Sequence, residues 1–171
     1  MEEINPKPDI IRHILKDEGR FPNSSLFLLI YKHVFNIADP EKIESTFHRN
    51  NWKNNWRNGI YDFAHYHSNT HEVLGIYEGK ARVQFGGPKG ITEEVSKGDV
   101  IIIPAGVAHH CIEAIESFKC VGAYPDGKDY DIKKGEAGER PQADRNIEAV
   151  PLPDSDPVFG EGSYLQLEWE L

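Results

Sequence analysis

Glycine and proline residues divide the middle of the chain, from about residue 57 to residue 125, into short pieces. Glycine-containing turns recur at 58–59, 78–80, 86–90, 97–99 and 104–106, and between them lie segments such as ARVQF, VIII and FKCVGAY. Short strands separated by turns at this spacing are typical of an all-β sandwich or barrel, not of a parallel sheet with crossover helices. We therefore expect residues 57–125 to form the core of an all-β barrel.

The residues before this core, 1–56, predict an extension with two short helices and one strand. In PDIIRHILKDEG, Ile11, Ile14 and Leu15 have the i, i+3, i+4 spacing of an amphipathic helix, which would end near Gly19. The apolar run SLFLLIYKHVF that follows favours a strand. Asp39-Pro40 then predicts the start of a second helix through EKIESTFHRN.

The residues after the core, 126–171, are rich in loop-forming residues, as in PDGKDYDIKKGEAGERPQADR. The final YLQLEWEL alternates apolar with polar residues, which predicts a half-buried strand that packs on the barrel or on a second subunit. Disorder is the alternative for the loop that precedes it. We expect residues 1–171 to form a single domain, with extensions at 1–56 and 126–171 around the core.

Composition excludes several classes of function. A net charge of -9 and a pI near 5.3 argue against nucleic-acid binding, which usually needs a basic surface. No apolar stretch is long enough to cross a membrane, and the polar, acidic start MEEINPKPD does not resemble a signal peptide. Two cysteines are too few for a disulfide scaffold and fit a reducing compartment, so we expect a cytoplasmic protein.

Histidines cluster at the start of the core, in GIYDFAHYHSNTHEVLGIYEG. On a strand His65 and His67 share one face, and a turn through SNTH would bring Glu72 on the next strand near them. Two imidazoles and one carboxylate form a ligand set that first-row transition metals favour. A further ligand is offered by His109, after the apolar strand and Pro-Gly turn of GDVIIIPAGVAHH. By the same alternation His71 points away from this site.

The spacing of these residues resembles the two motifs of the cupin family. Gly59, His65-x-His67, Glu72 and Gly79 match the first motif, and Gly98, Pro104-x-Gly106 and His109 match the second, with Glu113 where the second motif usually ends in asparagine. The phrases WRNGIYDFAHYHSNTHEVLG and VGAYPDGKDYD resemble the uncharacterised YjlB-like cupins more closely. The resemblance implies a double-stranded β-helix, the cupin jelly-roll barrel, with His65, His67, Glu72 and His109 as metal ligands.

Alternation also predicts a mostly apolar pocket beside the metal. If the ligands point inward, so do their neighbours of the same parity, and a hairpin near Ile115-Glu116 would place two cysteines opposite each other. Those cysteines are either buried thiols or a redox pair. Arg57 is either a clamp for a substrate carboxylate at the rim or a surface residue. The expected lining residues are Tyr61, Phe63, Leu74, Ile76, Cys111 and Cys120.

Three functions are compatible with such a site, and the sequence names neither the substrate nor a general base. The first is a metal-dependent enzyme on a small organic molecule, with dioxygenase-like or isomerase-like chemistry. The second is a small-molecule binding or sensing protein whose metal anchors a ligand, and the third is a barrel stapled by its metal. The expected cofactor is one divalent transition metal ion, Fe, Mn, Ni, Zn or Co. A homodimer is the expected assembly.

Overall fold

The computed structural model describes residues 2–170 and confirms an all-β jelly-roll barrel. Its main sheet has seven strands in the order β1-β2-β6-β4-β7-β3, with β5 paired to β4, and its sheet pairings are antiparallel. The barrel strands are β1 (Asp9–His13), β2 (Leu28–Lys32), β3 (Trp52–Asn58), β4 (Glu72–Phe85), β5 (Ile91–Ser96), β6 (Val100–Ile103) and β7 (His109–Pro125).

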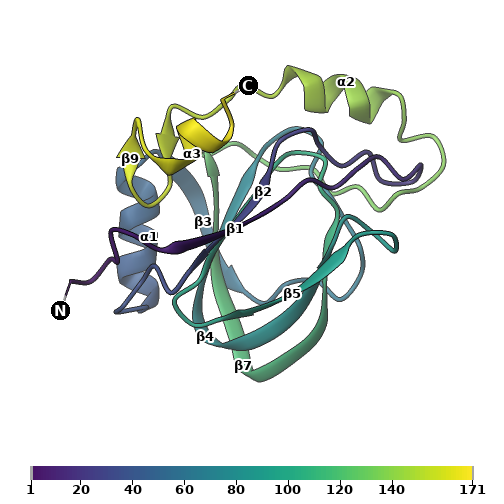
Figure 1. Ribbon diagram of the computed structural model, residues 1–171. Helices are drawn as coiled ribbons and strands as arrows, with labels where there is room; N and C mark the ends of the chain where they lie inside the picture. Colours follow the sequence, from purple (N-terminus) through teal and green to yellow (C-terminus); the bar gives the residue numbers. More distant parts are fainter. Residues whose placement is uncertain (1, 171) are drawn as a thin grey trace.

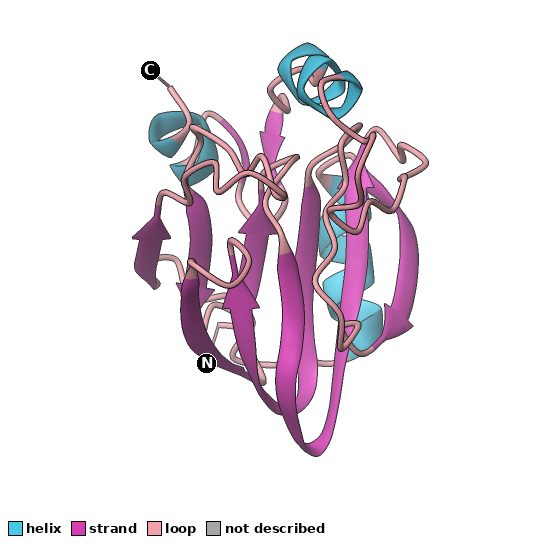
Figure 2. Ribbon diagram, turned by 90° about the vertical axis from the view of Figure 1, so that its right-hand side faces the viewer, coloured by secondary structure: helices cyan, strands magenta, loops and turns pink. Residues whose placement is uncertain are grey.

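Among residues 2–170, three helices and a small hairpin lie around the barrel. Figure 1 shows α1 along one side of the barrel, with the C-terminal helices near its upper end. In Figure 2 the strands run roughly parallel to the view's vertical axis, and α2 lies beyond their upper ends. The bounds are α1 (Pro40–Arg49), α2 (Gln142–Ala149), α3 (Tyr164–Glu168), β8 (Ser155–Asp156) and β9 (Gly160–Glu161).

The two faces of the central strands are buried in different cores. Along β2, Leu28 and Ile30 belong to the cluster inside the barrel, whereas Leu29 and Tyr31 belong to the cluster on its outer face. The VIII run of β6 divides in the same way, which explains why four successive apolar residues occur there. The outer cluster is covered by α1 and by the C-terminal residues, including Trp169. The extensions thus bury a sheet face that would otherwise be exposed to water.

The two long strands β4 and β7 pair along their length and bend together. The register shifts between Ile76 and Lys80, where Gly79 has φ 71° and Glu116 and Ser117 of β7 have φ near 58°. A Cβ at Gly79 would lie 2.5 Å from the carbonyl oxygen of Ile115, so glycine permits the close approach. This bulge bends the two-stranded ribbon, so that its two arms form facing parts of the barrel wall.

Two predictions about the extensions are confirmed, and two are wrong. The strand at SLFLLIYKHVF and the helix from Pro40 occur as β2 and α1. The helix predicted at residues 8–19 is instead β1, because Ile10 and Ile11 complete an edge of the sheet by pairing with β2. The strand predicted from YLQLEWEL is wrong over its described residues, which form α3, while Leu171 lies outside the described residues. The start of α3 is capped by a hydrogen bond from the Ser163 amide to Gln166 Oε1.

The hairpin predicted near Ile115-Glu116 is also wrong. β7 runs without a break from His109 to Pro125, and its positive-φ residues form the bulge described above. Cys111 therefore pairs with Val83, and Cys120 pairs with Ile76, so the two cysteines do not lie opposite each other. The loop after the barrel is not a free segment, since it forms α2 and contacts the barrel through the Tyr66–Lys133 bridge. Within residues 2–170 no helix combines the length and apolar character needed to cross a membrane.

Candidate metal centre

His65 and His67 lie on the extended segment between β3 and β4. The amides and carbonyls of His65 and His109 exchange two hydrogen bonds, 3.2 and 2.9 Å long, which hold this segment against the start of β7. In this extended backbone the side chain of Tyr66 packs on the opposite side, against Phe21. The alternation thus places His65 and His67 on one side, as the sequence predicts.

Glu72 and His109 are the first residues of β4 and β7, and the bend in the ribbon brings them together. His109 pairs with Phe85 at the far end of β4, thirteen residues after Glu72. Because both strands bend at the bulge, the two ends of β4 approach each other at the same end of the barrel. Glu72 Oε1 lies 3.2 Å from His109 Nε2, and Glu72 Oε2 lies 3.3 Å from His67 Nε2.

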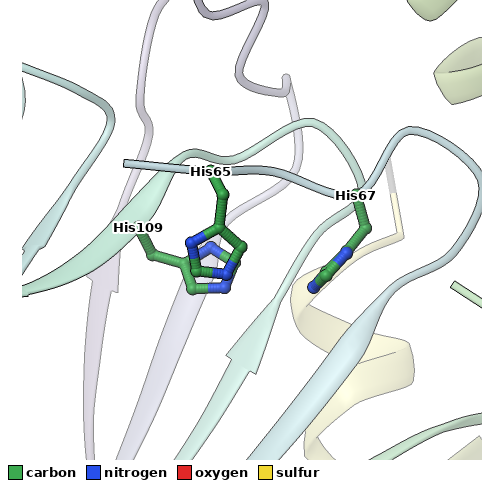
Figure 3. Close-up of side chains that lie close together, drawn as sticks. All are labelled: His65, His67 and His109. Carbon is green, nitrogen blue, oxygen red and sulfur yellow. The ribbon is translucent and has the colours of Figure 1, made fainter. Parts of the chain in front are cut away.

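The three imidazoles converge on one point. Figure 3 shows His65 and His109 side by side, with His67 facing them. One ligand atom of each ring lies within 4.8 Å of those of the other two, and the ring centroids of His65 and His109 are 4.2 Å apart. All four side chains are buried, with at most 4% of each residue exposed. Three buried histidines beside one carboxylate are a suitable ligand set for a transition metal ion.

The hydrogen bonds of the other ring nitrogens fix the tautomer of each histidine. Nδ1 of His65 lies 3.1 Å from the carbonyl oxygen of Phe63, and Nδ1 of His109 lies 3.0 Å from that of Val107. Nδ1 of His67 bonds to the carbonyl oxygen of Asp131. Because a carbonyl oxygen only accepts, each Nδ1 carries the proton and each Nε2 presents a lone pair to the site. His67 Nε2 is buried, and its neighbour at 3.3 Å is Glu72 Oε2, another proposed ligand atom.

The charge of the buried Glu72 carboxylate favours a cation between it and the three histidines. Burial raises the pKa of Glu72, but the facing imidazoles of His67 and His109 outweigh burial and hold this pKa well below its ordinary value. Burial lowers the pKa of His65 to about 3, and the nearby His109 adds to this effect. Burial also lowers the pKa of His67, but the Glu72 carboxylate outweighs it and raises that pKa. The site therefore holds an ionised carboxylate and a neutral His65.

A small cavity opens beside the four side chains. It has a volume of about 150 Å³, and its lining includes Tyr61 and Leu74 of the residues expected from the sequence. Phe63, Ile76, Cys111 and Cys120 are not part of the lining. Ile76 and the two cysteines pack in the core inside the barrel, where apolar side chains fill the space below Leu74. Phe63 lies outside the lining, stacked on Tyr61 with centroids 4.8 Å apart.

Two tyrosines and a tryptophan complete the site, and sequence reasoning missed them. The Tyr124 hydroxyl donates to Glu72 Oε2 at 2.7 Å and accepts from Trp56 Nε1 at 2.8 Å. Tyr130 stacks on Tyr124 with centroids 4.8 Å apart. Gly122 leaves room for the indole, since a Cβ there would lie 2.1 Å from the Trp56 ring. The bulge in β7 reverses the parity between His109 and Tyr124, so simple alternation along the strand could not find this tyrosine.

Other histidines and Arg57 have different roles. His71 is buried away from the site, where its Nδ1 accepts from the Ala105 amide and its ring packs on Trp169. Arg57 combines features of both predicted roles, since it borders the cavity but donates two hydrogen bonds to Glu44 on α1, 2.9 and 2.7 Å long.

Comparison with known proteins identifies similar sequences and folds. The family model described as Cupin matches residues 35–121. The uncharacterized protein YjlB of Bacillus subtilis is 38% identical over 158 residues, which cover 92% of this chain and 94% of that protein.

Solved structures give weaker likenesses. Pumpkin seed globulin is 25% identical, with a TM-score of 0.39, over 47% of this chain and 22% of the globulin. The chain thus spans about a fifth of the globulin's length. A DUF861 family protein from Thermotoga maritima is 24% identical, with a TM-score of 0.37, over 56% of this chain and 96% of that protein.

Proposed function

The chain belongs to the cupin family, and we propose that it is a metal-dependent enzyme acting on a small organic substrate, with dioxygenase-like or isomerase-like chemistry. The cofactor is one divalent transition metal ion, held by His65, His67, Glu72 and His109. The observation that carries the proposal is the convergence of three Nε2 atoms whose Nδ1 partners are all backbone carbonyls. That pattern is typical of histidines that bind metals.

In such a site the residues of the chain have separate roles: some orient the metal ligands and others bind the substrate. A divalent metal ion supplies Lewis acidity to a bound carbonyl or, when it is iron, reactivity toward dioxygen. The three backbone carbonyls orient the imidazoles, and the hydroxyl of Tyr124 orients Glu72. The cavity binds the substrate next to the ligands, and Leu74 with the apolar core below it excludes water from that side.

The test is metal analysis of protein purified without chelator or nickel resin. We expect a first-row transition metal at near-stoichiometric level in the wild type. The variant Glu72→Gln should lose most of it, because a neutral amide is a weaker ligand for a divalent cation than an ionised carboxylate. The matched control is His110→Ala, which removes the neighbouring imidazole on the other side of β7. Wild-type protein without near-stoichiometric metal would overturn the metal site.

Catalysis needs its own measurement. Metal-loaded protein should consume oxygen or convert a compound in a panel of carbonyls, phenols and sugars. If it does neither, the enzymatic part of the proposal fails and the metal site remains.

One observation favours a second candidate, a binding or sensing protein without turnover. Apart from the four proposed ligands, the described residues that line the cavity include no carboxylate, imidazole or thiol. The Tyr124 hydroxyl is already engaged with Glu72 and Trp56. A site of this kind binds a ligand on its metal with few groups available for proton transfer. Thermal stabilisation by a compound without formation of product would support this candidate.

We also place the protein in the cytoplasm, as a single-domain chain that forms a homodimer. The two extensions support a single domain, because both contribute side chains to the cluster on the outer face of the barrel. Leu152 and Leu167 of the C-terminal extension are 56% and 69% exposed, and a second subunit would shield such side chains from water. Light scattering should give the mass of a dimer, and the mass of a monomer would contradict it.

A further inference from the structure

Apolar side chains gather at the mouth of the cavity. Within residues 2–170, nine large apolar residues are exposed, and four of them lie on the two segments that border this mouth. Single exposed apolar residues are ordinary on a protein surface, but several in one place mark a binding surface. We call this group the apolar platform, and it consists of Tyr61 (46% exposed), Phe63 (38%), Tyr130 (38%) and Ile132 (39%).

The platform is built from two extended segments that run side by side. Tyr66 and Lys133 pair through two backbone hydrogen bonds, each 2.9 Å long, which hold the segments together. Along residues 130–134, exposed residues alternate with half-buried ones. The exposed ones are Tyr130, Ile132 and Lys134. This alternation turns the side chains of Tyr130 and Ile132 outward on the same side.

Contacts between the two segments join these side chains into one surface. Tyr61 and Phe63 stack with centroids 4.8 Å apart and ring planes 20° apart. Lys134 Nζ lies 5.2 Å from the centroid of the Phe63 ring. Tyr130 lies near Tyr61, since burial and then the Tyr61 hydroxyl raise the pKa of Tyr130. Ile132 is between Tyr130 and Lys134 in the chain, which places it on the same surface.

The platform continues the wall of the cavity. Tyr61 and Tyr130 line the cavity and are exposed as well. The ring centroids of Tyr61 and His65 are 5.1 Å apart, and those of Tyr130 and His67 are 5.2 Å apart. The cavity therefore opens to solvent beside these two tyrosines, and a molecule bound next to the candidate ligands can extend outward over the platform.

The area of the platform indicates what covers it. Side chains of this kind have about 200 Å² of surface each, so at the exposures given above the platform offers roughly 300 Å². A stable protein interface takes about 800 Å² from each partner. The platform is thus too small to hold a second copy of the chain or another protein by itself, but its area suits the tail of a small molecule.

Resting on the proposed metal site, we infer that the substrate is an amphiphile, whose polar head binds in the cavity and whose apolar tail lies outside the barrel on the platform. The open mouth of the cavity admits the tail, and removing the tail and the platform from water stabilises the complex. Phe63 and Ile132, whose side chains do not line the cavity, recognise the tail and set the preference for it.

The probes are two hydroxamates titrated calorimetrically into zinc-loaded protein, since zinc has no redox chemistry and leaves them intact. Acetohydroxamate and octanohydroxamate have the same metal-binding head and differ in the length of the alkyl tail. Octanohydroxamate should bind the wild type at least about tenfold more tightly, because its tail moves from water onto the platform. Equal affinities for the two probes overturn the inference.

Variants of the platform locate the tail. The double variant Phe63→Ala with Ile132→Ala should reduce the preference for octanohydroxamate at least about threefold. Zinc affinity should be retained, because the substitution keeps the backbone carbonyl that accepts from His65 Nδ1. The matched control is Ile37→Ala, which removes an isoleucine of nearly equal exposure, 38%, before α1 and should keep the wild-type preference.

The outcomes separate this inference from the proposed function. If zinc binds but the double variant keeps the full preference for octanohydroxamate, the tail binds elsewhere, so the inference is overturned and the metal site stands. If light scattering shows a dimer that the double variant dissociates, the platform is an interface between copies, and the inference is overturned as well. If zinc does not bind the wild type, the proposed function falls, and the inference falls with it.

Discussion

The position of the proton on the imidazoles of His65, His67 and His109 decides which ring nitrogen can bind a metal. Backbone carbonyls of Phe63, Val107 and Asp131 accept hydrogen bonds from Nδ1, which leaves Nε2 of each imidazole to bind a metal. Glu72 is oriented in the same manner, because Tyr124 donates to one of its oxygens. At the scale of single residues, the site is therefore set by hydrogen bonds that the ligands make away from the metal.

Tyr124→Phe tests this orientation. The variant keeps the ring and its stacking but removes the proton that Glu72 accepts, so zinc affinity should fall about tenfold to a hundredfold. Competition with a chromophoric chelator measures the affinity. Tyr77→Phe, on β4, is the matched control, since no hydrogen bond of its hydroxyl occurs within residues 2–170. Equal zinc affinity in wild type and Tyr124→Phe would show that this hydroxyl does not orient the ligand.

At the scale of elements, the bend in the β4–β7 ribbon brings the ends of the two strands to one place. Glu72 and Tyr124 lie on one arm, and His109 lies on the other. A straight ribbon would hold Glu72 far from His109, because thirteen residues of extended strand span about 40 Å. The bulge at Gly79 is thus a requirement of the site, although it lies in the middle of β4, where the ribbon bends away from the site.

Gly79→Ala tests the bulge. The new Cβ would lie 2.5 Å from one carbonyl oxygen and 2.6 Å from another, at a φ of 71°, so unfolding free energy should fall by about 3 kcal/mol. Urea denaturation measures the loss. Gly19→Ala is matched in its positive φ but has no neighbour within 4 Å, and should lose about 1 kcal/mol. Equal losses in the two variants would mean that close packing at Gly79 adds nothing.

The C-terminal extension acts on the site through Asp131. Its carbonyl accepts from His67, and its carboxylate accepts from the amide and the hydroxyl of Ser68. Asp131→Ala should lower zinc affinity about tenfold, because the carbonyl that orients His67 is no longer held in place. Asp144→Ala, which breaks an exposed pair with Arg140 in the same extension, should leave zinc affinity unchanged. Competition with the same chelator measures the zinc affinity of both variants. Equal losses of zinc affinity in the two would mean that the effect comes from general loosening of the extension.

At the scale of the whole molecule, the barrel has two cores that do not depend on a metal. Apolar side chains fill the inside of the barrel below the site, and a second cluster joins the outer face to α1 and the C-terminal residues. The proposed metal site lies at one end, above Leu74. The fold should therefore persist without metal, and metal should add stability by binding only the folded chain.

Chelation tests this separation of fold and site. With free zinc at a hundred times its Kd, binding adds about 2.7 kcal/mol, which raises Tm by about 5–10 °C for a chain of this size. Chelated protein should still give one cooperative melting transition at the lower temperature. The double variant His67→Ala with Glu72→Ala should melt at the same temperature with and without zinc. Complete unfolding on chelation would instead identify the metal as a structural staple.

The sequence by itself determined the all-β class and the identity of the four candidate ligands. Turn residues recur at short intervals, and the alternation of an extended segment places His65 and His67 on one side; both depend on neighbours within a few residues. The same local reasoning failed at residues 8–19 and 164–170. In the first segment, pairing with β2 outweighed an apparent helical periodicity. In the second, the cap of α3 outweighed an apparent alternation.

Only the tertiary structure decided what surrounds the ligands. Tyr124 enters the site because a bulge reverses the parity of β7, and Tyr130 and Asp131 enter because the C-terminal extension returns to the barrel. The meeting of Glu72 with His109 likewise depends on the bend in the paired strands. These contacts join residues far apart in the chain, and no local pattern encodes them, because they arise from packing between elements that the sequence specifies one at a time.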